Sequence, residues 1–352
     1  MDAKRSADSA AVASEAERVE AAPSGALSRD IVVVGASAGG VQALQRLVSG
    51  LPAQYRGSVF IVVHIGPEAR SELPAILRRV GHLPAMHASD EMPIRPGHVY
   101  VAPPDHHLLI EPGHLTVVHG PRENRHRPAI DPLFRSAAWA YGPRVVGVVL
   151  TGSLDDGTAG LWAIKSCGGT TIVQEPDEAA HPDMPLNALM HNRIDHRLPI
   201  DQIAPLLVRL AGEPVDPPPR PQPPATLHDE IEFAKLNRDI RSAAHLGRLS
   251  AFTCPACRGA LWELEEGGHL RYRCHTGHAY SQDSLLADQT VAMEDGLYTA
   301  LRAVEENSAA LRRLADRWPE HASATGLSYE GRAQELDRSA EMLRAMLARS
   351  MP

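Results

Sequence analysis

The sequence predicts an α/β fold, in which a doubly wound, mainly parallel sheet carries a β-hairpin insertion and is followed by a small cysteine-rich module and C-terminal helices. Three short β-branched runs, each closed by glycine or proline, are typical of buried parallel strands. They occupy residues 31–34, 59–63 and 145–150. Segments with helical apolar spacing separate them, as in doubly wound sheets.

The helices and strands between these runs are predicted from apolar spacings of three and four residues for helices and from short apolar runs for strands. The segments 107–111 and 115–118 flank Pro112-Gly113, which is a hairpin signature. We place this predicted domain at residues 29–211. Helices are expected in it at 41–48, 71–80, 132–141 and 161–167, and further strands at 98–102 and 170–174.

The rest of the chain divides by composition. Residues 1–28 are rich in Ala, Ser and Glu and lack the apolar region of a secretory signal, so we expect a disordered or loosely helical tail. Seven prolines between Pro214 and Pro224 predict a semi-rigid linker at 212–226. The remaining part, 227–352, is expected to hold a helix at 227–246, a cysteine module at 250–280 and a helical hairpin.

Composition excludes several classes of protein. A net charge of −8 and a pI of about 6.1 argue against a nucleic-acid partner. No apolar stretch is long enough for membrane insertion. The chain has four cysteines, three of them between Cys254 and Cys274, which suits a reducing cytoplasm and a bound metal better than disulfides.

A serine, a histidine and an aspartate follow the three β-branched runs. Ser37 lies within the G-x-S-x-G pattern after the first run, His64 ends the second, and Asp156 follows the third. The carboxyl ends of parallel strands share one edge of a sheet, so these side chains are expected to converge. A serine hydroxyl needs an adjacent base and an orienting carboxylate to become a nucleophile. The pattern therefore predicts a hydrolase triad, which needs no cofactor for catalysis.

Two other interpretations remain open from the pattern alone. A glycine-rich turn after a first strand is also typical of nucleotide binding, but Ser37 replaces the second glycine of G-x-G-x-x-G. The acidic residue that would bind a ribose is also missing, and His64 lies near that place. The remaining interpretation is that His64 is a buried, hydrogen-bonded core histidine.

Several motifs occur in order over residues 29–205, namely GASAGG, VFIVVHI, NRHRPAIDPLF, VGVVLTGSLDDGTAGL and Met184-Pro185. Together they resemble the CheB-type protein-glutamate methylesterase domain of bacterial chemotaxis. The resemblance implies a cytoplasmic enzyme that hydrolyses γ-glutamyl methyl esters on methylated chemoreceptors and also deamidates certain glutamines. It implies that Ser37 is the nucleophile, His64 the base and Asp156 the orienting carboxylate. Asp155 falls where the family more often has a neutral residue.

The sequence departs from this family in two respects. The family usually has threonine after the serine, where Ala38 stands here, so the backbone N–H groups of Ala38 and Ser153 are the expected oxyanion donors. The family's enzymes also usually carry an N-terminal receiver domain, whereas about 28 residues precede the domain here. We therefore expect control by another domain or a partner. A non-catalytic signalling scaffold with an esterase-like fold is the alternative function, and Ala38 is the feature that favours it.

Arg125 and Arg127 lie in a polar, basic run at 124–127. They are expected either to form structural salt bridges in a solvated loop or to line a rim that binds an acidic receptor surface.

Cys254, Cys257, Cys274 and His278 have the spacing of a zinc ribbon, with a hairpin signal at Gly267-Gly268 between the two pairs. His275 is the rival fourth ligand. Because protein atoms would fill all four positions, a zinc ion here is expected to be structural. The terminal helices are expected to pack as a hairpin or to self-associate through an apolar stripe, although a docking role for a partner remains open. The stripe comprises Leu297, Leu301, Val304, Leu311, Leu336, Ala340, Leu343 and Leu347.

Overall fold

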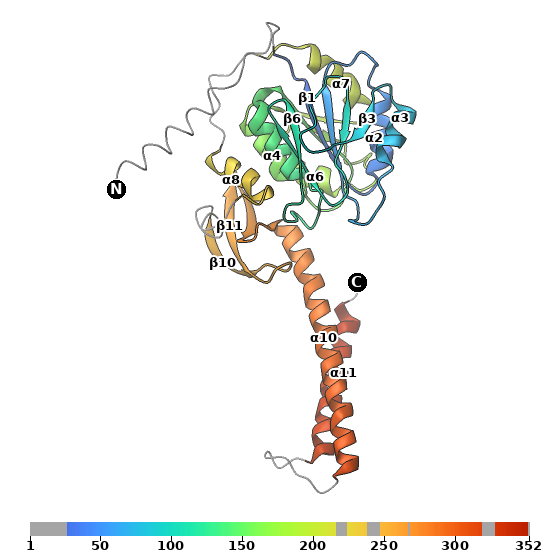
Figure 1. The fold of residues 1–352 in the computed structure, drawn as a ribbon, viewed down its shortest axis with the longest axis vertical. Coiled ribbons are helices and arrows are strands. Elements are labelled where there is room, and N and C mark those ends of the chain that lie inside the picture. Colours follow the sequence, from blue (N-terminus) through green and yellow to red (C-terminus); the bar gives the residue numbers. More distant parts are fainter. Residues whose placement is uncertain (1–26, 216–223, 238–246, 267, 319–327, 351–352) are drawn as a thin grey trace, which may run out of the picture.

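A computed structural model describes residues 27–215, 224–237, 247–266, 268–318 and 328–350. These residues form an α/β domain, a small antiparallel ribbon packed beneath it, and a long helical arm that extends away from both (Figure 1). Most of the predicted tail and most of the proline-rich linker lie outside the described residues.

A seven-stranded sheet forms the centre of the α/β domain, and all its neighbouring strands are parallel. The predicted doubly wound sheet is therefore confirmed. β3 and β9 are each three residues long, which is too short to show a periodicity, and the sequence did not predict them. The spatial order is β3 (Ala85–His87), β4 (Val99–Val101), β2 (Ser58–Val63), β1 (Ile31–Ala36), β7 (Val145–Val149), β8 (Thr170–Gln174) and β9 (His196–Leu198).

Helices cover both faces of the sheet. Successive residues of β1 point to opposite faces, so Val32 joins one apolar core and Val33 the other. Burial on both faces explains why the central strands are continuous apolar runs instead of alternating ones. One face carries α2 (Gly40–Ser49), α3 (Leu73–Val80) and α7 (Ile200–Gly212). The other carries α4 (Ile130–Tyr141), α5 (Thr158–Ser166), α6 (Asp183–His191) and the predicted hairpin of β5 (His107–Glu111) and β6 (His114–Val118).

The C-terminal part begins with α8 (Ala225–Ala234) and continues into a four-stranded antiparallel ribbon. The helix predicted at 227–246 is wrong at its C-terminal end, because Leu236 has a positive φ of 61° and is exposed. Residues 238–246 lie outside the described part of the chain. The ribbon consists of β10 (Arg248–Thr253), β11 (Ala260–Glu266), β12 (His269–Cys274) and β13 (Ala279–Ser281).

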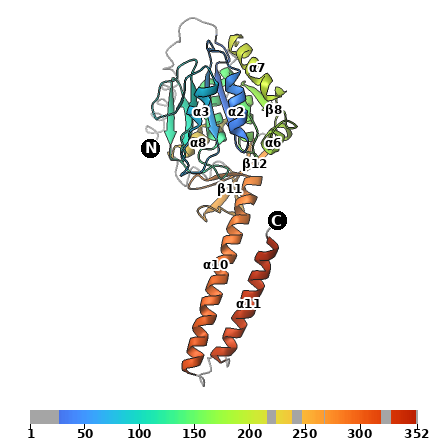
Figure 2. The ribbon, with the colours of Figure 1, turned by 90° about the vertical axis from the view of Figure 1, so that its right-hand side faces the viewer.

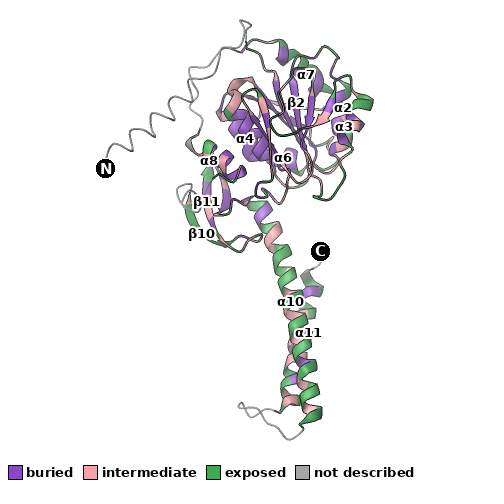
Figure 3. Ribbon diagram, in the orientation of Figure 1, coloured by how far each residue is buried: buried purple, intermediate pink, exposed green. Residues whose placement is uncertain are grey.

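The helical arm consists of α10 (Gln282–Arg317) and α11 (Tyr329–Ser350), which lie side by side (Figures 1 and 2). Ala340 and Leu347 of the predicted stripe are buried between the two helices, while most of the remaining arm surface is exposed (Figure 3). The stripe thus serves the packing of the predicted hairpin. Across the described segments, no helix is both long and apolar enough to cross a bilayer.

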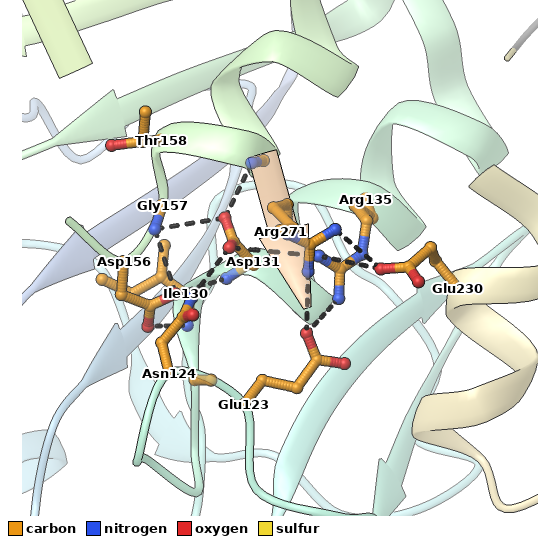
Figure 4. Close-up of polar contacts among 12 residues, drawn as sticks. Glu123, Asn124, Ile130, Asp131, Arg135, Asp156, Gly157, Thr158, Glu230 and Arg271 are labelled. Carbon is orange, nitrogen blue, oxygen red and sulfur yellow. Dashed lines mark hydrogen bonds and ion pairs between the residues drawn. The ribbon is translucent and has the colours of Figure 1, made fainter. Parts of the chain in front are cut away.

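Buried charges fill the junction between the α/β domain and the ribbon (Figure 4). Arg273 donates to Glu230 Oε1 at 2.7 Å and to Glu123 Oε1 at 3.0 Å. Arg271 donates to Glu230 Oε2 at 2.8 Å. Burial opposes ionisation of Glu230, but the surrounding arginines lower its pKa overall. We call this group of side chains the junction cluster. Its three carboxylates and three guanidinium groups belong to Glu123, Glu230, Glu266, Arg135, Arg271 and Arg273.

Substituting Glu230→Gln in the junction cluster is expected to lower the free energy of unfolding by about 3–5 kcal/mol, because buried guanidinium groups lose their counter-charge. Denaturant unfolding followed by circular dichroism measures the change. The control is Glu305→Gln, which removes an exposed pair with Arg344 on the arm and is expected to cost about 1 kcal/mol or less. Equal losses in the two variants would contradict the stabilising role of the cluster.

Candidate active site

Ser37 lies in a tight turn between β1 and α2. Its backbone N–H donates to Thr151 O at 3.0 Å, which ties the turn to the loop after β7. Gly39 caps α2 with φ 74°, and a Cβ placed there would lie 2.9 Å from the Cβ of Ala180. The turn therefore requires glycine at this position, both for its left-handed backbone and for space.

The structure brings Ser37, His64 and Asp156 into one hydrogen-bonded chain. The Ser37 hydroxyl lies 3.1 Å from Nδ1 of His64, and Nε2 of His64 lies 2.7 Å from Oδ2 of Asp156. The side chains of His64 and Asp156 are only 5% and 2% exposed. An ionised Asp156 accepts a hydrogen bond from the Nε2–H of His64, which leaves the Nδ1 lone pair facing the hydroxyl. The imidazole is thus within proton-transfer distance of the serine.

Asp156 is surrounded by hydrogen-bond donors (Figure 4). Its carboxylate accepts the backbone N–H of Ile130 at 2.7 Å, that of Gly157 at 3.0 Å, and Nδ2 of Asn124 at 2.9 Å. Burial opposes its charge, but hydrogen bonds from His64, Ile130 and Asn124 lower its pKa overall. Asp156 is therefore ionised at neutral pH.

Asp131 and His126 complete this site, and the sequence did not single out either one. Asp131 accepts the N–H of Gly160 at 2.7 Å, and burial together with the charge of Asp156 raises its pKa to about 6. The ring of His126 stacks on that of His64 with 3.6 Å between centroids. Burial and the proximity of His64 lower the pKa of His126 to about 3, so it stays neutral beside the base. Their only sequence signal was membership of the run 124–134.

A cavity of about 490 Å³ opens onto Ser37 and His64 and is also lined by Ala38. Ser153 is exposed in the loop that follows β7. The oxyanion role of the Ala38 and Ser153 N–H groups stays a prediction. The remaining lining residues are Ile65, Gly66, Pro67, Arg122, Arg125, His126 and Arg127.

The two arginines predicted for the rim line this cavity, but both form ion pairs. Arg127 donates to Asp105 at 2.7 Å and to Gly120 O at 2.8 Å, which is the structural alternative left open by the sequence. Arg125 donates through Nε to Asp288 of α10 at 2.6 Å. Arg122, which the sequence did not single out, is exposed at the same cavity.

Cys254, Cys257, Cys274 and His278 meet at one end of the ribbon, and their ligand atoms lie within 4.8 Å of one another. The sulfurs of Cys257 and Cys274 are 3.6 Å apart, and Nδ1 of His278 is 3.8 Å from Sγ of Cys254. Zinc–sulfur bonds of about 2.3 Å in a tetrahedron place sulfurs ~3.8 Å apart. The four residues therefore could hold a metal ion, and His275 is not among them.

Residues 32–207 match a family model described as CheB methylesterase. A Leptospira interrogans protein with the provisional name protein-glutamate methylesterase/protein-glutamine glutaminase is 38% identical over 185 residues, covering 52% of this chain and 96% of that protein. Protein-glutamate methylesterase/protein-glutamine glutaminase 4 of Anaeromyxobacter dehalogenans is 38% identical over 52% of each chain. The CheB methylesterase catalytic domain of Thermotoga maritima superposes with a TM-score of 0.50 and 30% identity, covering 51% of this chain and 98% of that domain.

The shifted pKa of Asp155 predicts that the stability of the folded protein depends on pH. Burial raises the pKa of Asp155 to about 7, although the hydrogen bond from the Ser281 hydroxyl at 2.7 Å acts in the opposite direction. A raised pKa means that the folded state favours the neutral carboxyl, so stability falls as the pH rises from about 4 through about 7. Asp155→Asn is therefore expected to raise the free energy of unfolding on the order of 1–3 kcal/mol at pH 8 and less at pH 5.

Thermal unfolding at the two pH values measures this difference. Asp177→Asn, which changes an exposed carboxylate, serves as the matched control and is expected to have no pH-dependent effect. A gain from Asp155→Asn that is the same at both pH values would disprove the assigned titration.

Proposed function

Because the chain belongs to the CheB methylesterase family, we propose that it is a serine-type protein-glutamate methylesterase acting in the cytoplasm on methylated chemoreceptors or similar signalling proteins. The observation that carries this proposal is the hydrogen-bonded chain from Ser37 through His64 to Asp156, which opens into the cavity. Deamidation of glutamine is proposed as a second activity, because an amide carbonyl presents the same electrophile. The names of the relatives support both activities.

The mechanism follows from the geometry. The Ser37 oxygen attacks the carbonyl carbon of the γ-glutamyl methyl ester while Nδ1 of His64 takes the hydroxyl proton. Asp156 holds the opposite ring nitrogen and stabilises the imidazolium. Collapse of the tetrahedral intermediate breaks the bond to methoxide, which leaves as methanol with the proton from His64. Water activated by His64 then hydrolyses the acyl-enzyme, which releases glutamate and restores Ser37.

The negative oxygen of the intermediate is proposed to bind the N–H groups of Ala38 and Ser153. Ala38 has no hydroxyl to add a further donor, and one such donor is worth on the order of 10²–10³ in rate. This absence is what favours the alternative of a non-catalytic scaffold. The complete triad, with both of its hydrogen bonds formed, favours the hydrolase.

The cysteine cluster is proposed to bind a structural zinc ion. Three thiolates and one imidazole would fill the tetrahedron, which leaves no position for a substrate or an activated water. The metal would fix the ribbon, and Cys274 lies one residue from Arg273 of the junction cluster.

Ser37→Ala is expected to lower methanol release from a methylated receptor by at least ~10³-fold, because the nucleophile is lost. Ser49→Ala changes an exposed serine at the end of α2 and is expected to leave the rate unchanged. The unmodified protein should also be labelled by a fluorophosphonate probe, and Ser37→Ala should not. Methanol release that survives in Ser37→Ala would rule out this nucleophile.

Cys254→Ser is expected to reduce bound zinc from one ion per chain to well below one, since a thiolate ligand is removed. Elemental analysis of the purified protein measures the ratio. Cys167→Ser alters a buried cysteine outside the cluster and should keep the full zinc content. Unchanged zinc in Cys254→Ser would reject this ligand set.

A further inference from the structure

A single asparagine links the proposed catalytic carboxylate to the base of the helical arm. Asn124 is 3% exposed, and its Nδ2 donates to Oδ1 of Asp156 and to Oδ2 of Asp131, each at 2.9 Å. Its Oδ1 accepts the backbone N–H of Ser281 at 2.9 Å and the hydroxyl of Ser284 at 3.2 Å. An ionised carboxylate only accepts and a backbone N–H only donates, so these partners fix the orientation of the amide.

The backbone around Asn124 is held by the same C-terminal elements. Asn124 N donates to Ala279 O of β13 at 2.8 Å, and Ala279 N donates to Arg122 O at 3.3 Å. Asn124 has a φ of 47°, which asparagine tolerates better than most residues. The ion pair between Arg125 and Asp288 ties the next residue to α10. The loop that supports Asp156 therefore takes its shape from residues outside the 32–207 family match.

Ser281 and Ser284 bring the N-terminus of α10 to this loop. They form a reciprocal capping box, in which each side chain bonds the other's backbone N–H. Ser284 is completely buried, so its hydroxyl is committed to contacts at the junction. The start of the arm is thus fixed both by its own cap and by Asn124.

We propose that Asn124 is a positioning residue for the methylesterase reaction and that the N-terminus of α10 completes the active site by holding it. This inference rests on the proposed function. Oδ2 of Asp156 orients His64, while Oδ1 accepts from Asn124 and from the backbone N–H groups of Gly157 and Asp131. Loss of the amide contact leaves the carboxylate freer to rotate, which weakens the alignment of the base with Ser37.

The first variant, Asn124→Asp, keeps the side-chain shape, tolerates the left-handed backbone and can still accept from Ser281 and Ser284. It replaces the amide donor to Asp156 with a carboxyl group, so above the pKa of the new carboxyl the donor is lost and a negative charge is added that stabilises the imidazolium of His64. Among the described residues, the other titratable groups that interact with Asp156 are Asp131 of α4, Asp155, His107 and His126. We expect kcat to fall on the order of tenfold or more, KM to stay unchanged, and the acid limb of the pH–rate profile to move to higher pH.

The second variant, Ser284→Ala, changes a residue of α10, which lies outside the 32–207 family match. It removes one of the two donors to Oδ1 of Asn124, so a fall in kcat of roughly three- to tenfold at constant KM is expected. Ser308→Ala is the matched control, because Ser308 is also a buried serine of α10 but bonds Ala333 and Asp337 within the arm. It should retain the kcat of the unmodified protein.

Methanol release and the rate of Ser37 labelling by a fluorophosphonate are measured on the full chain of each variant. The proposal is overturned if Asn124→Asp and Ser284→Ala keep the normal kcat, pH profile and labelling rate, or if Ser308→Ala loses as much as Ser284→Ala. Normal methanol release in Ser284→Ala with none in Ser37→Ala leaves the proposed function intact and refutes the coupling. Labelling that slows in both test variants, with no methanol released by the unmodified protein, supports the coupling and refutes the substrate. A protein that is neither labelled nor active refutes both.

Discussion

The buried negative charge of Asp156 determines the arrangement of the active-site edge. Desolvation alone would favour the neutral acid, which lacks the negative charge that stabilises the imidazolium of His64. Besides His64, the compensating donors come from three separate segments, namely the start of α4, the loop after β7, and the loop carrying Asn124. One charge therefore fixes three loop conformations together, and the serine turn is tied to the same edge through Thr151.

The same rule governs the junction between the α/β domain and the ribbon. Arg271 and Arg273 lie two residues apart on β12 and so point to the same face of the strand. Their carboxylate partners are Glu230 of α8, Glu266 of β11 and Glu123 of the loop before α4. Glu123 also pairs with Arg135 of α4, so the buried charges of the two units form one shared cluster. Separation of the two units would break the contact between Arg273 and Glu123 and leave part of the buried charge uncompensated, which favours the docked arrangement.

The sequence predicted those features that depend on local periodicity. β8 matches its predicted residues, and β1, β2 and β7 lie within one or two residues of theirs, because β-branched runs mark buried parallel strands. The convergence of Ser37, His64 and Asp156 was also predictable, since parallel strands end at one edge. The catalytic roles of these residues remain proposals.

Other features depend on loop conformation and on contacts distant in sequence, which periodicity does not show. The contacts of Asn124 require a positive φ at both Asn124 and Arg125. Alternating charges on β12 are typical of a solvent-facing strand, yet Arg271 and Arg273 are buried because distant glutamates meet them. For Arg127 the sequence left open a structural salt bridge or a rim that binds a partner, because its ion-pair partner Asp105 lies 22 residues away in the chain.

The position of the arm bears on how such a site can be controlled. The C-terminal part of this chain contacts the loop that supports Asp156, through the bonds of Ser281 and Ser284 to Asn124. A neighbouring cavity is lined by Arg122, Arg125 and His126 on one side and by Asp288 and Asp295 of α10 on the other, so the arm borders the catalytic cavity without covering Ser37. A helix of 36 residues is about 54 Å long. Its base contacts Asn124 and Asp155 through Ser281 and Arg125 through Asp288, so a tilt of the arm would act on this group of contacts. Control through this contact would support or release the triad instead of blocking access to it, which distinguishes it physically from occlusion by a domain lying over the cavity.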